Sequence, residues 1–295
     1  MRVADHSPGS LRSSLRAGRL LLSFGPLQAR VIAKEAGFAC SLHRLYGSWE
    51  AVSADTDVGD ITLCLRRRGL RHWVWVVNGR ESPRIFPRAM ALAQFEWAMH
   101  LAMAVALAPR VSIHAAVVVR PDGRAAALVG RSGTGKSTLA AGLVAAGWTL
   151  AADEFLVLEP SGDIAPVPAV ITLKGSSIDL IRSRSPDGTF SPVAIDAERG
   201  PIAHYAAPRL ARPDSPVDLR TIVFPRYAAD ADPLVRALPR GEAIIRLGRQ
   251  SHNLHLAGPE GFRLVAGLAR RPVHAARYAS LDAGMQVVND LLEEA

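Results

Sequence analysis

Cysteine and lysine are both scarce in this sequence. Cys40 and Cys64 are the only thiols in 295 residues, which is too few to crosslink a chain of this length, so a disulfide-stabilised scaffold is excluded. Of the 35 basic residues, only Lys34, Lys136 and Lys174 are lysines. Because arginine serves almost everywhere that either cation would do, each lysine is a candidate for a specific role.

Long hydrophobic runs are also missing. No stretch has the roughly eighteen uninterrupted apolar residues that predict a membrane-spanning helix. The best candidate, Phe95–Ala108, carries Glu96 and His100, which favours a buried helix. Met1–Arg19 has no apolar centre and does not resemble a signal peptide, so we expect it to be disordered. We therefore expect a cytoplasmic protein without a membrane partner.

Low-complexity tracts are absent, and 49% of the residues are hydrophobic against 21% charged. This composition excludes disorder as the dominant state. The net charge of +8 raises the question of a nucleic-acid partner. The positive charges are scattered, however, and only Arg66–Arg68 form a run, so we predict no nucleic-acid binding.

The length predicts about two domains. Residues 20–109 form an N-terminal α+β region, because the segment up to Val77 is rich in strand-like runs and Ala89–Ala108 has helical character. We place a boundary near Arg110, so that residues 110–295 form a second, α/β domain.

A glycine-rich motif stands at the centre of this second domain. Gly130-Arg-Ser-Gly-Thr-Gly-Lys-Ser137 satisfies the G-x-x-x-x-G-K-[ST] pattern of phosphate-binding loops. The apolar run Ala125–Val129 precedes it and predicts a strand, and Ser137–Ala146 follows it and predicts a helix that ends at Gly147. The order of strand, glycine loop and helix is the one that the motif requires.

Such a loop binds phosphate because its backbone amides can turn inward around the oxygens, and the helix N-terminus adds partial positive charge. Lys136 can reach the terminal phosphates, and the Ser137 hydroxyl can bind Mg²⁺. The sequence therefore predicts a nucleotide site with ATP and Mg²⁺ as cofactors. Its predicted binding residues are Gly130, Arg131, Ser132, Gly133, Thr134, Gly135, Lys136, Ser137 and Thr138.

Two adjacent acids interrupt the apolar segment Trp148–Leu158. Asp153 and Glu154 are costly inside a buried strand unless they are solvated or paired with a cation. Metal and phosphate chemistry would supply that cation. The alternative is a strand end that exposes both acids to water.

The segment before the loop predicts a β-hairpin. Ile113–Arg120 and Arg124–Val129 have strand character, and Pro121–Gly123 is a turn sequence between them. In the usual doubly wound nucleotide-binding fold, a parallel strand arriving from a helix leads into the loop instead.

With these features the sequence resembles the HPr kinase/phosphorylase family, whose P-loop core is shared with phosphoenolpyruvate carboxykinase. The similar pieces are Ile113–Ala116, Gly130–Ser137 and Leu150–Glu154, in the family's order and spacing. The HPr kinase-related kinase A subgroup is more similar still, through Phe95–Trp97, Thr221–Tyr227 and Pro272–Tyr278. The resemblance implies a P-loop kinase core with a mixed sheet, preceded by the β-rich N-terminal region.

The resemblance also implies roles for individual residues. Lys136 and Ser137 match the family's phosphate and magnesium positions, and His114 matches its histidine before the loop. Asp153 matches the first acidic position, which we assign as the general base that takes the proton of an acceptor hydroxyl. Glu154 stands where the family usually has a second aspartate and can still face the metal.

Three further positions are informative. Lys174 is a candidate contact for phosphate or acceptor because lysine is so rare in this sequence, and Arg226 is a candidate for the mobile arginine that phosphoryl transfer needs. Thr172 stands where HPr kinases have a metal-associated glutamate, so the family's reverse, phosphorolytic activity is not carried over.

We therefore expect an ATP- and Mg-dependent kinase that phosphorylates a hydroxyl, most plausibly Ser of a peptide or small protein. Two alternatives use the same loop: an ATPase that switches a partner protein, and a nucleotide sensor without transfer activity. The acidic pair argues against the sensor, because binding alone does not need both carboxylates. The family resemblance implies self-assembly, so a homo-oligomer is expected.

Overall fold

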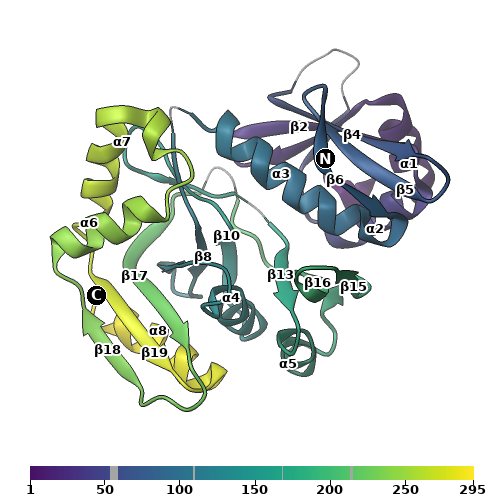
Figure 1. The fold of residues 1–295 in the computed structure, drawn as a ribbon. Coiled ribbons are helices and arrows are strands. Elements are labelled where there is room, and N and C mark those ends of the chain that lie inside the picture. Colours follow the sequence, from purple (N-terminus) through teal and green to yellow (C-terminus); the bar gives the residue numbers. More distant parts are fainter. Residues whose placement is uncertain (54–58, 109, 168, 213–214) are drawn as a thin grey trace. The chain divides into compact units, whose positions relative to one another are not determined.

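The structure is a computed structural model that describes residues 1–53, 59–108, 110–167, 169–212 and 215–295. It is an α/β protein with several mixed sheets (Figure 1). The chain forms two compact units. Unit 1 comprises Met1–Ala106, Thr172–Ile178 and Thr189–Ala206, and unit 2 comprises Leu107–Ile171, Asp179–Gly188 and Ala207–Ala295.

The main sheet of unit 1 has six strands in the order β3-β1-β2-β4-β5-β6. They are β1 (Leu20–Phe24), β2 (Leu27–Ala33), β3 (Ala51–Ser53), β4 (Ile61–Arg68), β5 (His72–Val77) and β6 (Arg80–Pro87). The pair β2 and β4 is parallel, whereas the other neighbours are antiparallel. This confirms the β-rich character expected for the N-terminal region.

Aromatic side chains form the core beneath this sheet. The Trp75 ring contacts Phe38 and Phe95, with ring centroids 5.1 and 5.3 Å apart, respectively, and its indole nitrogen donates to the carbonyl of Ala91. These rings come from the sheet and from two helices, so their burial holds the layers together. The helical elements of unit 1 are η1 (Val3–Asp5), α1 (Pro8–Ala17), α2 (Ala36–Leu45), η2 (Arg88–Met90) and α3 (Ala91–Ala106).

The first residues differ from our expectation of disorder, because Pro8–Ala17 forms helix α1. The Ser7 side chain accepts a hydrogen bond from the Ser10 amide and caps the helix, and Pro8 occupies its first turn. Leu11 and Leu15 are fully buried. Two leucines one helical turn apart give only a weak apolar periodicity, which is why the helix escaped prediction.

We expected residues 110–295 to form one uninterrupted second domain, but part of this range belongs to unit 1. Two later segments return to it and form a small sheet in the order β13-β16-β14, with β15 paired to β16. The strands are β13 (Ile171–Lys174), β14 (Thr189–Phe190), β15 (Ala194–Asp196) and β16 (Gly200–Ala206). Long-range pairings of this kind leave no signal in local sequence periodicity.

Helix α3 confirms that the apolar segment before residue 108 is helical. The stretch Arg88–Ala106 is long and apolar enough to cross a bilayer by length and composition alone, but 56% of its apolar window is buried inside the protein. The core helix of a soluble protein has the same properties.

The main sheet of unit 2 has the order β10-β8-β9-β17-β19-β18. Its strands are β8 (Ala115–Val119), β9 (Arg124–Val129), β10 (Thr149–Ala152), β17 (Asp218–Tyr227), β18 (Leu234–Ala237) and β19 (Val273–Tyr278). β8 and β9 form the predicted antiparallel hairpin. β9, β17 and β19 are parallel, so their carboxyl ends meet at one edge, as in other open α/β sheets.

A second, three-stranded sheet and five helices complete the element list. The sheet has the order β12-β11-β7, from β7 (Val111–Ile113), β11 (Leu156–Leu158) and β12 (Ile164–Ala165). The helices are α4 (Lys136–Ala145), α5 (Ser177–Arg184), α6 (Arg240–Arg249), α7 (Leu254–Leu268) and α8 (Leu281–Glu293). Helices α4 and α8 pack together so closely that a Cβ on Gly142 would lie 2.8 Å from the Leu281 side chain.

Candidate functional site

The glycine loop, residues 130–135, joins β9 to α4. The Thr134 hydroxyl donates to the carbonyl of Arg131 at 3.0 Å, which closes the loop on itself. Outside the loop, the Gly130 amide donates to the His114 carbonyl at 3.4 Å, and the Tyr227 amide donates to the Thr134 carbonyl at 3.0 Å. The loop is thus fixed from β8 on one side and from β17 on the other.

Gly135 is required where the loop turns into the helix. Its φ of 94° lies in the left-handed region, which favours glycine. A Cβ there would also lie 3.0 Å from both the Tyr227 Cβ and the Tyr278 hydroxyl. The loop backbone can therefore approach these tyrosines only because the residue is glycine.

Lys136 is the first residue of α4, and its side chain is buried. Its ammonium nitrogen lies 3.4 Å from Oδ1 of Asp153 and 3.6 Å from Oε1 of Glu154. The two acids that the sequence placed on the next strand therefore lie beside the lysine of the motif. The alternative interpretation was a strand end that exposes both acids to water. It is wrong for Asp153, because this residue is only 1% exposed.

Asp153 and Glu154 lie at a break between strands rather than inside one. β10 pairs with β8 in the main sheet, whereas β11 pairs with β7 in the three-stranded sheet, so the chain changes sheets at the acids. Glu154 has a φ of 72°, one of two positive values among the described non-glycine residues. Such strained backbone is typical of functional sites. Oδ2 of Asp153 is buried and has no hydrogen-bond partner within the described residues.

Two histidines contact Glu154. His114 lies between β7 and β8, and its Nε2 is 2.7 Å from Oε2 of Glu154. His252, which precedes α7, places Nε2 3.4 Å from the Glu154 carbonyl oxygen, and its ring lies 4.8 Å from that of Phe155. The resemblance implied only that His114 matches the family's histidine before the loop, and the structure pairs this side chain with Glu154. His252 escaped prediction because it lies 98 residues from Glu154 in the sequence.

Burial and charge perturb the titration of this cluster. Burial raises the pKa of Asp153, and the negative charge of Glu154 raises it further, while Lys136 and His114 act in the opposite direction. Burial lowers the pKa of Lys136, but the carboxylates of Asp153 and Glu154 outweigh this, so its pKa is raised. Burial also lowers the pKa of His252. A carboxyl whose pKa is raised is a better proton acceptor than an ordinary aspartate once it is ionised.

The residues present suit a magnesium ion. The unpartnered Oδ2 of Asp153 is an orphaned acceptor, and a hard divalent cation prefers such oxygens. Ser137 and Thr138 follow Lys136 in the first turn of α4, where hydroxyl groups can add neutral ligands. The described residues contain no cluster of three His, Cys, Asp or Glu side chains arranged to hold a metal. A magnesium ion at a phosphate site does not need such a cluster, because water and phosphate oxygens supply several of its ligands.

The predicted site residues do not all fall in this cluster. His114, Lys136, Asp153 and Glu154 come together in unit 2. Lys174 belongs to unit 1, where its amide donates to the Ser177 hydroxyl. Thr172 is in the same unit, with its hydroxyl 3.3 Å from Nδ1 of His204.

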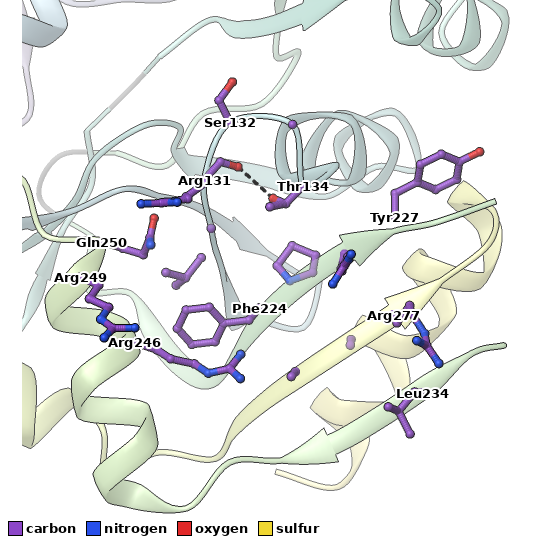
Figure 2. Close-up of a pocket in the computed structure, with 17 residues that line it drawn as sticks. Arg131, Ser132, Thr134, Phe224, Tyr227, Leu234, Arg246, Arg249, Gln250 and Arg277 are labelled. Carbon is purple, nitrogen blue, oxygen red and sulfur yellow. Dashed lines mark hydrogen bonds between the residues drawn. The ribbon is translucent and has the colours of Figure 1, made fainter. Parts of the chain in front are cut away.

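Arg226 lies at the end of β17 and lines a cavity of about 1200 Å³ beside the glycine loop (Figure 2). The loop residues Gly130–Thr134 form one wall of this cavity, and most of the other lining residues belong to β17, β19 and α6. Phe224 lies at its centre, with the guanidinium carbon of Arg246 5.7 Å from its ring centroid. The cavity residues of α6 and β19 are far from the loop in the sequence and carry no motif, so they escaped prediction.

Neither a protein-family model nor a curated protein matches this sequence. The chemistry that this site can perform is therefore inferred from the residues that form it.

Proposed function

We propose that this protein is an ATP- and Mg-dependent phosphotransferase that transfers the γ-phosphoryl group to a hydroxyl. The observation that carries the proposal is the buried contact between Lys136 of the glycine loop motif and Asp153, at 3.4 Å. A cation that binds phosphate and a carboxylate that can accept a proton thus lie within one hydrogen-bonding distance of each other. The proposed architecture is the P-loop kinase core that the sequence resembles.

The loop and its helix supply the phosphate site. Backbone amides of the glycine loop and the N-terminus of α4 favour the negative charge of a triphosphate. Lys136 would exchange its contact with Asp153 for contacts with the terminal phosphates. Ser137, Asp153 and Glu154 would hold Mg²⁺, which neutralises charge on the phosphate oxygens when bound.

Asp153 acts as the proposed base. As the acceptor oxygen forms its bond to the γ-phosphorus, the bond from that phosphorus to the bridging oxygen breaks and ADP leaves with the electron pair. The acceptor proton passes to the Asp153 carboxylate, whose raised pKa suits this task. His114 is a positioning residue in this scheme, because it holds Glu154 through the contact at 2.7 Å.

The acceptor that we propose is a serine of a peptide or small protein. One experiment separates this from the alternatives: incubation with γ-labelled ATP, Mg²⁺ and either candidate Ser peptides or a cell extract, followed by location of the label. Label on a protein or peptide hydroxyl is the expected result. Free phosphate alone would support the ATPase, and neither product would support the nucleotide sensor; both results contradict the kinase.

A further inference from the structure

The cavity beside the glycine loop is strongly basic. Five arginines contribute to its lining: Arg131, Arg226, Arg246, Arg249 and Arg277. No Asp or Glu is among its lining residues. Figure 2 shows Arg246 and Arg249 beside Phe224, Arg131 on the glycine loop near Gln250, and Arg277 farther along, near Leu234. We call this set the arginine pocket.

Part of this charge is compensated inside the protein. Arg246 pairs with Glu242 at 2.7 Å, and Nε of Arg277 donates to the carbonyl of Asp232 at 2.9 Å. The other three, Arg131, Arg226 and Arg249, make no side-chain ion pair or hydrogen bond with any residue that the structure describes. Like charges that share a cavity repel one another, so this arrangement favours an anionic ligand.

The sheet order separates the arginine pocket from the acids. Asp153 follows β10 at one end of the main sheet, and the pocket lies over β17 and β19 on the other side of β9. A triphosphate on the loop that presents its terminal phosphorus to Asp153 extends toward the pocket. A nucleoside is neutral, however, and offers no negative charge to these three exposed guanidinium groups. Planar guanidinium groups instead match phosphate oxygens in both charge and geometry.

We propose that the arginine pocket binds a phosphate group that is not part of the triphosphate chain. This inference rests on the proposed function, since it takes the glycine loop as the triphosphate site. The phosphate has two possible sources: a separate phosphorylated small molecule, or a phosphate on the ribose of the nucleotide itself. Both sources offer the same dianion to Arg226 and Arg249.

The test uses the full-length protein and two probes. In the first arm, calorimetry measures binding of inorganic pyrophosphate to protein saturated with a non-hydrolysable ATP analogue, so that the loop is occupied. In the second arm, the affinity of ADP is compared with that of ADP carrying a 3′-phosphate. Each arm is repeated with R226A/R249A and with R71A/R270A, a control that removes two exposed arginines outside the pocket.

If the phosphate comes from a separate small molecule, the wild type should bind pyrophosphate. If it is on the ribose of the nucleotide, the wild type should prefer the 3′-phosphorylated nucleotide. R226A/R249A should lose about tenfold in that affinity, and the control should change less than about twofold. Equal losses in both variants, or no effect of either probe on the wild type, overturn the proposal. Binding of the ATP analogue itself, compared between wild type and K136A, tests the proposed function separately.

Discussion

The ammonium nitrogen of Lys136 lies 3.4 Å from Oδ1 of Asp153, and both side chains are buried. Each residue therefore compensates the charge of the other. A triphosphate on the glycine loop would compete for the same ammonium group, so the ion pair and the proposed phosphate contact exclude each other in part.

Replacing Lys136 by Ala should destabilise the protein by about 3 kcal/mol at pH 8, because it leaves the Asp153 charge buried without its cation. The loss should be smaller at pH 5, where the carboxyl, whose pKa burial already raises, can take up a proton. Urea unfolding of the wild type and K136A at both pH values measures this loss in the free energy of unfolding. K34A, at an exposed lysine, is the control, and K136A/D153N should recover much of the loss. Equal instability of the single and double variants would contradict the pairing.

Replacing Gly135 by Ala should both destabilise the protein and weaken ATP binding. The new Cβ would lie 3.0 Å from the Tyr227 Cβ and the Tyr278 hydroxyl, in addition to the strain of the left-handed backbone. G123A is a matched control, since Gly123 has a φ of 92° but no atom within 4 Å of the added Cβ. Both variants should lose about 1 kcal/mol from backbone strain, and G135A should lose more. Thermal unfolding and ATP titration measure the difference in stability and in ATP affinity between G135A and G123A. Equal losses in the two variants would show that the tyrosine contacts do not restrict residue 135.

Replacing His114 by Gln should lower the rate of phosphoryl transfer about tenfold with little change in the KM for ATP. The reason is that His114 positions Glu154 rather than binding the nucleotide. H255Q, at an exposed histidine of α7, serves as the control. A large rise in KM with unchanged kcat would show that His114 binds the nucleotide instead.

His204 should make the stability of the protein depend on pH. Burial lowers its pKa to about 4, whereas a histidine in the unfolded chain has a pKa of about 6.5. Below pH 6.5, His204 therefore binds a proton in the unfolded state but stays neutral in the folded state. The free energy of unfolding consequently falls as the pH drops toward 4. Between pH 6.5 and pH 5 the loss amounts to about 2 kcal/mol.

Replacement of His204 by Leu removes this titration, so the pH dependence of unfolding should be weaker in H204L than in the wild type. H72L, at an exposed histidine, should keep the wild-type slope. Denaturant unfolding from pH 7.5 to pH 5 measures all three slopes. Identical slopes in H204L and the wild type would show that His204 is not held neutral in the folded protein.

Much of the site was predictable because its signals are local. The glycine motif, the hairpin β8–β9 and the acidic pair each occupy a short stretch of sequence with a recognisable pattern. The spacing from Lys136 to Asp153 covers one helix and one strand, which is enough to return the chain to the same edge of the sheet. The close approach of those two side chains follows from this geometry.

The rest depends on contacts between distant parts of the chain. Nothing near Thr189–Ala206 indicates that this segment pairs in unit 1 rather than in unit 2. The change of sheet at Glu154 requires β7 as the partner of β11, and neither strand has a sequence signal for the other. The arginine pocket likewise collects residues from the loop, β17, α6 and β19, which no periodicity relates.

In the proposed mechanism, Asp153 takes the proton of an acceptor while the glycine loop holds the triphosphate. The most direct test is single-turnover transfer of the γ-phosphoryl group by D153N, with ATP occupancy matched by calorimetry, beside D187N as a control at an exposed aspartate. We predict that D153N binds ATP within about threefold of the wild type but loses at least about a hundredfold in the transfer rate, while D187N transfers normally. Transfer by D153N at the wild-type rate would contradict the claim.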